Sequence, residues 1–158
     1  MQFEDDDLTY FEEHGAAPLP APVEVTGALT VKLWISSSAP DTDFTAKLVD
    51  VNPCGFARNL TDGIIRARFR ESFTHEKMLA PSEVTEFTID MWSTSNMFQK
   101  GHRIRVEISS SNFPRFDRNP NTGHPLFADA ETRPAIQTVM HSRGLASHVV
   151  LPVVPANR

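Results

Sequence analysis

The sequence lacks several features that would assign it to a membrane or secreted class. Its single cysteine, Cys54, rules out an internal disulfide. No stretch approaches the ~20 apolar residues of a membrane span. The acidic start, MQFEDDDLTYFEEHG, has no apolar core of the kind found in a signal peptide. We therefore expect no membrane association, and the missing signal peptide favours the cytoplasm.

Basic charge is also in short supply. The chain has 15 Lys and Arg against 20 Asp and Glu, a formal net charge of −5. That balance opposes a general affinity for nucleic-acid backbones or anionic membranes. The length of 158 residues fits one domain spanning residues 1–158, with residues 1–7 expected to form a flexible acidic tail.

Catalytic and metal-binding motifs are missing as well. No G-x-S-x-G nucleophile elbow is present, and the six histidines are scattered without metal-ligand spacing. The aspartates of PDTDF (40–44) are the one acidic pair of interest. Asp41 and Asp43 either bind calcium through their oxygens or, as we favour, form a turn that starts a strand. We expect no catalytic residue, metal or cofactor in this chain.

What the sequence does contain is repeated two-residue alternation, the pattern of strands with one face on a core. In HRIRVEIS (102–109), Ile104, Val106 and Ile108 alternate with charged residues. The other alternating apolar sets are Val31, Leu33 and Ile35; Phe44, Ala46 and Leu48; Ile65, Ala67 and Phe69; and Phe87, Ile89 and Met91. Two further strands are expected in 135–142 and 146–154, around a turn at 142–144, and residues 8–11 are a candidate for one more.

Turn-forming Pro, Gly, Asn and Asp separate these runs, and only 58–62 and 71–79 are candidates for a helical turn. A chain of eight or so strands without a long helix must bury its apolar faces sheet against sheet. The sequence therefore predicts an all-β fold, a two-sheet jelly-roll β-sandwich like that of galactose-binding domains.

Arginines form a stripe in the run at 65–70. Arg66, Arg68 and Arg70 alternate with the apolar set, which predicts that they lie on the outward face of a strand. Exposed aromatics are not interleaved with them, so a nucleic-acid platform is not favoured. We expect a solvated face, one paired with Glu86 or Glu107, or one covered by a partner domain.

Aromatic residues supply the candidate ligand-binding positions. Trp34 and Trp92 fall out of phase with the core sets of their strands, so each is a candidate platform for stacking a sugar ring. A second set lies in the loop SSSNFPRFDRNPNTG (109–123). Its candidate residues are Phe113, Arg115, Phe116 and Arg118. We favour a structural and interdomain role for this loop, in which the phenylalanines plug the end of the sandwich and the arginines find acidic partners.

Four stretches together resemble the C-terminal jelly-roll domain of the group of serine hydrolases that includes X-Pro dipeptidyl-peptidases, cocaine esterase and α-amino-acid ester hydrolases. They are residues 23–55, GIIRARFRES (63–72), the FQKGHRIRVEISSSNFPRFDRNPNTG stretch (98–123) and HSRGLASHVVLPVV (141–154). The similarity runs in order from about Leu8 to Pro155. In that family the catalytic triad belongs to a preceding α/β-hydrolase domain, on which the jelly roll packs.

The resemblance implies a non-catalytic accessory domain whose partner is an α/β-hydrolase catalytic domain acting on esters, amides or X-Pro peptides. No catalytic residue of the family carries over to this chain. A stand-alone carbohydrate-binding module is the alternative, and an oligomerisation module that forms homo-oligomers is a third.

Overall fold

The structure is a computed structural model that describes residues 2–4, 17–128 and 130–155. Its strands, in chain order, are β1 (Gln2–Glu4), β2 (Val23–Ser37), β3 (Asp43–Val51), β4 (Ala57–Arg66), β5 (Thr85–Phe98), β6 (Arg103–Ser109), β7 (Ile136–Val139), β8 (His141–Ser142), β9 (Leu145–Ala146), β10 (His148–Val150) and β11 (Val153–Val154). One 3-10 turn, η1 (Ala67–Phe69), follows β4. No helix in the described part of the chain has the length and apolar character needed to cross a bilayer.

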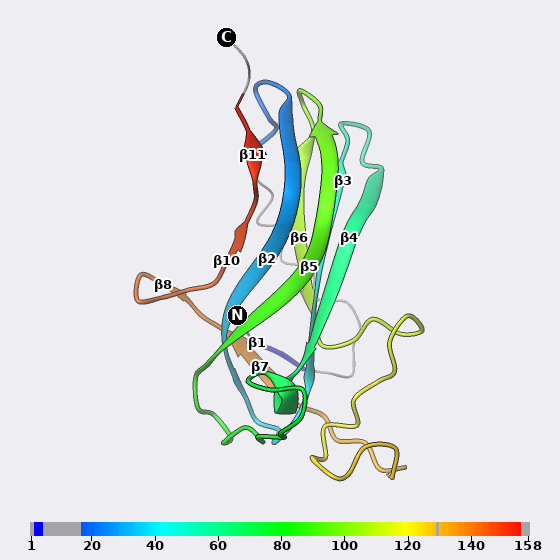
Figure 1. Ribbon diagram of the computed structural model, residues 1–158, viewed down its shortest axis with the longest axis vertical. Coiled ribbons are helices and arrows are strands. Elements are labelled where there is room, and N and C mark those ends of the chain that lie inside the picture. The colour runs from blue at the N-terminus through cyan, green and yellow to red at the C-terminus, as the bar shows by residue number, and fades with distance from the viewer. Residues whose placement is uncertain (1, 5–16, 129, 156–158) are drawn as a thin grey trace.

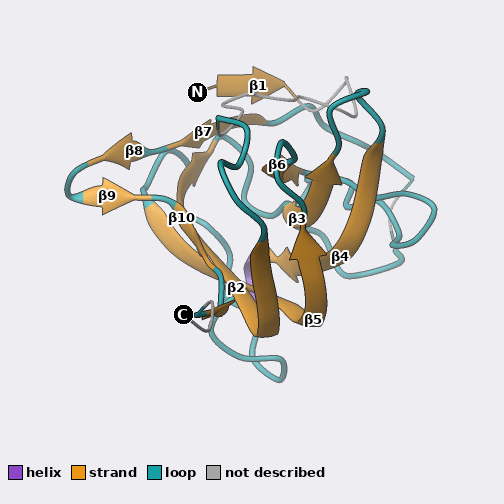
Figure 2. Cartoon of the chain, turned by 90° about the horizontal axis from the view of Figure 1, so that it is seen from above, coloured by secondary structure: helices purple, strands orange, loops and turns teal. Residues whose placement is uncertain are grey.

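Two antiparallel sheets face each other (Figure 1). In the six-stranded sheet, β2 pairs with β5 along one side and with β7, β10 and β11 along the other, and β1 pairs with β7. The three-stranded sheet has the order β4-β3-β6. The short hairpin β8-β9 projects on the side of β7 and β10 (Figure 2). The expected all-β, two-sheet sandwich is confirmed.

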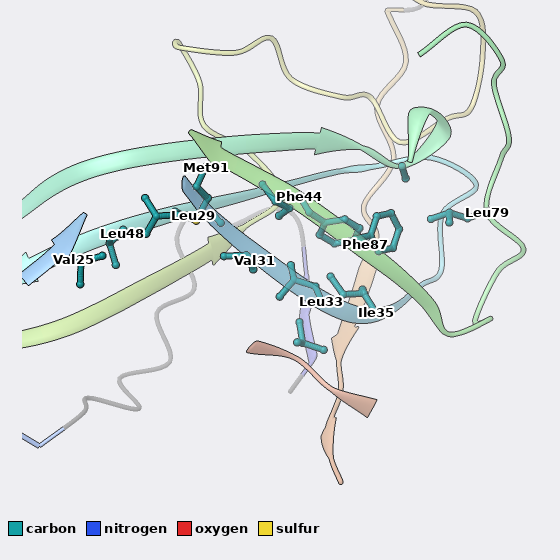
Figure 3. Close-up of a cluster of buried hydrophobic side chains, with 14 of the residues drawn as sticks. Val25, Leu29, Val31, Leu33, Ile35, Phe44, Leu48, Leu79, Phe87 and Met91 are labelled. Carbon is teal, nitrogen blue, oxygen red and sulfur yellow. The ribbon is translucent and has the colours of Figure 1, made fainter. Parts of the chain in front are cut away.

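The core lies between the sheets and follows the predicted alternation. Val31, Leu33 and Ile35 of β2 are at most 3% exposed, because every second side chain of a strand points to the same face. The predicted core residues of β3 face them from the other sheet, and those of β5 lie beside them in the same sheet (Figure 3). The rings of Phe44 and Phe87 meet edge to face with centroids 4.9 Å apart. The apolar set of β6, including Val106, packs against this core while only partly buried, as its phase predicted.

On one flank, β4 and β5 bring the two sheets together. The Thr61 hydroxyl donates to the Met91 carbonyl oxygen at 2.6 Å. A Cβ atom on Gly63 would lie only 2.1 Å from the Asp90 carbonyl oxygen, far inside van der Waals contact. Glycine at this position is therefore what allows β4 to approach the backbone of β5.

Several local predictions were wrong. The run at 65–70 is not a single strand, because β4 ends at Arg66 and η1 begins at Ala67. Residues 58–62 lie within β4 instead of a helical turn. The turn at 142–144 is confirmed as part of the β8-β9 hairpin, but the flanking strands are shorter than expected and both β7 and β10 pair with β2. The possible strand at 8–11 lies outside the described residues. Of the acidic segment 1–7, residues 2–4 form β1.

Candidate functional site

A buried polar cluster occupies the end of the sandwich that carries η1. This end, opposite the described C-terminal strand β11 in Figure 1, is called the η1 end below. The arginine–aspartate cluster consists of Asp41, Asp43, Arg66, Arg68 and Asn119. Arg66 donates two hydrogen bonds to the Asp43 carboxylate, from Nε to Oδ1 at 2.8 Å and from Nη2 to Oδ2 at 2.9 Å. This pairing follows from strand register, because Asp43 and Arg66 lie directly opposite each other on β3 and β4.

Arg68 forms the most deeply buried ion pair of the cluster. Its Nε donates to Asp41 Oδ2 at 2.7 Å and its backbone N–H donates to Asp41 Oδ1 at 3.0 Å. The two side chains are 2% and 0% exposed. Arg68 also donates through Nη2 to the His124 carbonyl oxygen at 2.9 Å and lies 3.4 Å from Glu76 Oε2. One side chain thereby joins the β2–β3 turn to two long loops.

Asn119 links both aspartates to the loop at 109–123. Its Nδ2 donates to Asp41 Oδ2 at 3.0 Å and to Asp43 Oδ1 at 2.9 Å. Its Oδ1 accepts the backbone N–H of Asn121 at 3.0 Å. Asn121 has a φ of +61°, a conformation that asparagine tolerates better than most residues. The loop is therefore fixed by satisfied polar contacts at a buried site, which supports the structural role expected for it.

Burial dominates the electrostatics at Asp43. It raises the pKa of the Asp43 carboxyl, although hydrogen bonds and charge attraction from Arg66 and a hydrogen bond from Asn119 act the other way. The same hydrogen bond to Asp43 raises the pKa of the Arg66 guanidinium, which therefore stays charged. The cluster thus holds charge at a cost in desolvation, as buried ion pairs commonly do.

These contacts correct two predictions. Arg66, Arg68 and Arg70 do not form a solvated stripe, because the change from strand to 3-10 turn after Arg66 ends the alternation. Arg68 is buried, and Arg70 donates to the carbonyl oxygens of Ala67 and Lys77 instead of to Glu86 or Glu107. Glu86 pairs with Lys32, and Glu107 with Arg105.

The PDTDF segment forms the favoured turn before a strand, since it lies between β2 and β3 and β3 begins at Asp43. The carboxylates of Asp41 and Asp43 accept hydrogen bonds from arginine and asparagine side chains, which the sequence did not predict. The spacing was a usable signal, since D-x-D at 41–43 matches R-x-R at 66–68 in length and opposite charge.

The four candidate residues of the 109–123 loop lie together on the surface. Arg115 pairs with Asp62 of β4, Nε to Oδ1 at 3.0 Å, which agrees with the expected acidic partner. Its guanidinium also lies 5.4 Å from the ring centroid of Phe116. Arg118 stacks over Phe113 at 4.9 Å. Phe113 is 56% exposed, so the expectation that it plugs the sandwich was wrong.

The two tryptophans lie far apart on the six-stranded sheet. Trp34 pairs with Glu86, and Trp92 lies six residues further along β5. At ~3.3 Å per residue this separation is roughly 20 Å. Trp34 is half-buried, and its backbone N–H donates to Ser147 Oγ at 2.9 Å. The two rings therefore do not form one stacking platform.

Trp92 lies in a β-bulge. Between the pairs Ala28–Ser93 and Thr30–Asp90, β2 supplies one residue and β5 supplies two, Met91 and Trp92. Trp92 takes a φ of +62°, and its backbone N–H donates to Asp90 Oδ1 at 2.8 Å. Trp92 is 71% exposed because it continues the outward set of β5, alternating with the buried Ile89 and Met91.

The described residues assemble no recognisable catalytic or metal centre. Within them, no three His, Cys, Asp or Glu side chains gather in a way that could hold a metal ion. His102 Nδ1 lies 2.8 Å from Asp50 Oδ1, which resembles two members of a triad. Asp50 also lies 3.5 Å from Arg58 Nη2, and no described serine hydroxyl bonds to His102. The fold and its buried cluster define a β-sandwich whose polar contacts hold loops in place.

Comparison with known proteins places this sandwich in a family. Residues 4–150 match the model of the X-Pro dipeptidyl-peptidase C-terminal non-catalytic domain. The chain belongs to that family, as its sequence motifs predicted.

Longer hydrolases contain regions similar to this chain. It is 47% identical over 152 residues to cocaine esterase of Rhodococcus sp., covering 95% of this chain and 26% of the relative. A putative serine esterase of Mycobacterium bovis is 32% identical, with coverage of 88% and 23%. Among solved structures, an archaeal aminopeptidase (Thaumarchaeota archaeon) superposes with a TM-score of 0.85 at 33% identity, covering 89% of this chain and 25% of that one.

An α-amino-acid ester hydrolase gives a TM-score of 0.84 at 32% identity, with coverage of 98% of this chain and 25% of that one. The chain thus spans about a quarter of the length of the relatives it matches.

Proposed function

We propose that this chain is the accessory domain of a longer serine hydrolase that cleaves esters or amides, X-Pro peptides among them. One observation carries the proposal: a non-catalytic family domain matches nearly the whole chain, while the hydrolases it resembles are about four times longer. The nucleophile, the histidine base and the oxyanion hole would then belong to the α/β-hydrolase portion of the parent chain.

The role that fits the geometry is mechanical support. The arginine–aspartate cluster fixes three loops at one end of a rigid sandwich, so that end presents a preformed surface. A preformed surface docks with little loss of conformational entropy. Such a domain would stabilise the hydrolase portion and help to wall the entrance of its active site.

The reading frame upstream of Met1 tests the proposal. We expect it to continue into a long coding stretch that contains a G-x-S-x-G elbow between a predicted strand and helix. A stop codon followed by a ribosome-binding site immediately before Met1 would instead make the domain independent and refute the proposed parent hydrolase.

Carbohydrate binding is the second candidate, and the exposed Trp92 is the observation that favours it. A flat ring at 71% exposure offers one stacking surface for a sugar. Affinity electrophoresis in glucan, xylan and mannan gels should then retard the wild type and not Trp92→Ala. Equal mobility of the two proteins in every gel would eliminate this function. Light scattering of the same samples tests the third alternative, an oligomerisation module, by measuring whether the chain forms homo-oligomers.

A further inference from the structure

Two phenylalanines at the η1 end are almost completely exposed. Phe73 is 86% exposed and Phe127 is 90% exposed. Single exposed apolar residues are common on protein surfaces and need no explanation. These two differ because the loops that carry them, residues 70–79 and 120–128, are held by contacts to buried groups.

The first loop is attached to the core on the C-terminal side of Phe73. The Lys77 backbone N–H donates to the Arg68 carbonyl oxygen at 2.9 Å, and that of Leu79 donates to the Pro40 carbonyl oxygen at 2.8 Å. Leu79 belongs to the hydrophobic core and is 7% exposed. The loop thus returns to the core shortly after Phe73, and a loop with such ties loses little freedom on docking.

The second loop lies beside the first. The His124 carbonyl oxygen accepts from Arg68 Nη2 at 2.9 Å. A Cβ atom added to Gly123 would lie 3.8 Å from Met78 Sδ, so the two loops lie close together there. Both loops lie at the same end of the sandwich (Figure 1).

Phe127 is held in an unfavourable conformation. Its φ is +63°, a region that bulky residues rarely occupy. It lies in a turn in which the Ala128 N–H donates to the Pro125 carbonyl oxygen at 3.3 Å. Strained backbone of this kind persists only where the surrounding structure holds it, and it clusters at functional sites, ligand clamps among them.

Charged pairs flank the apolar side chains. Lys77 Nζ lies 2.6 Å from Glu71 Oε1 on the first loop, and Arg133 Nε lies 2.8 Å from Glu131 Oε1 shortly after the second. All four side chains are at least half exposed. An apolar centre with a polar rim of both signs is the composition of a protein–protein interface.

We infer that the surface formed by Phe73, Met78 and Phe127 is where the hydrolase portion of the parent chain docks. The inference rests on the proposed function, because the missing three quarters of the relatives' length supplies the occupant. Phe73 and Phe127 are its anchors, and the arginine–aspartate cluster holds both loops in the docking geometry.

Hydrogen–deuterium exchange of this 158-residue chain, compared with the same residues within the parent hydrolase, tests the surface. We expect backbone amides of 70–79 and 123–128 to exchange roughly tenfold or more slowly in the parent, since an interface suppresses local opening. Residues 52–56 at the other end should exchange equally in both. Phe56 there is 63% exposed and serves as the matched control.

Variants of the parent hydrolase give a second readout. The pair F73S and F127S together should shorten the half-life of thermal inactivation several-fold, whereas F56S should leave it unchanged. All of these substitutions are on the surface of the domain. In the isolated domain, wild type, F73S/F127S and F56S should therefore have the same melting temperature by circular dichroism.

The outcomes separate the two proposals. Protection confined to other residues, with F73S/F127S as durable as the wild type, overturns the assigned surface and leaves the proposed function intact. No protection anywhere in the domain overturns both, because the hydrolase portion then does not dock.

Discussion

Replacing Arg68 by methionine should destabilise the domain strongly, although no residue of a catalytic site is touched. Arg68 and Asp41 are 2% and 0% exposed and meet at 2.7 Å. Removing one partner of such a pair costs about 3–5 kcal/mol, because the other charge stays buried. Asp41 would keep two hydrogen bonds, from the backbone N–H of residue 68 and from Asn119, which places the loss near the lower limit.

A loss of about 3 kcal/mol corresponds to a fall in melting temperature of roughly 6–12 °C for a chain of this size. Urea titration followed by far-UV circular dichroism measures the free energy of unfolding directly. Lys32→Met is the matched control: its bond to Glu86 is 2.8 Å long, but the side chains are 42% and 36% exposed. Its loss should be at most about 1 kcal/mol.

The double variant Asp41→Asn with Arg68→Met separates charge pairing from packing. Removing both charges leaves no orphaned carboxylate, so its loss should be smaller than the sum of the two single losses. Strict additivity of the two losses, or an Arg68→Met protein as stable as Lys32→Met, would refute the interpretation of Arg68 as the central tie of the η1 end.

Three further predictions concern the rest of the sandwich. Gly63→Ala should cost about 1–3 kcal/mol in urea titration, because its Cβ would lie 2.1 Å from the Asp90 carbonyl oxygen, whereas Gly144→Ala meets nothing within 4 Å and should be near neutral. Equal losses of stability in the two variants would disprove the close approach of β4 to β5 at Gly63. Val106→Asp should lose roughly 3 kcal/mol by placing an unpaired charge against the core, and a parental melting curve would disprove its phase. Burial raises the pKa of the Asp43 carboxyl in the folded protein above its ordinary 3.8. Its contribution to stability is therefore complete below pH 3.8 and is lost as the pH rises through the pKa of the folded state. The stability of Asp43→Asn relative to wild type should increase with pH, and a decrease would show that ion pairing outweighs burial.

The sheets were predictable because burial is periodic. In the middle of β2 and the first half of β5 one face is apolar, so alternation alone gave Val31, Leu33, Phe87 and Ile89 as core residues. The same signal failed at 65–70. Apolar and charged residues still alternate there, but the chain has left the sheet, and a tertiary ion pair draws Arg68 inward.

The polar site was hard to predict because its partners are far apart in the chain. Asn119 and Asp41 are separated by 78 residues, and only the fold brings them within 3.0 Å. Family resemblance located the loop and its structural role. It did not give the partners, since these depend on the register of β3 against β4, which places Asp43 opposite Arg66.

Covalent labelling with a fluorophosphonate probe tests the central claim most directly. The probe reacts with the activated serine of serine hydrolases. Applied to the proposed parent hydrolase, it should modify one serine outside residues 1–158, and the isolated chain should remain unlabelled and inactive on p-nitrophenyl esters. A labelled serine within this domain, with ester turnover that the label abolishes, would contradict the account of a non-catalytic accessory domain.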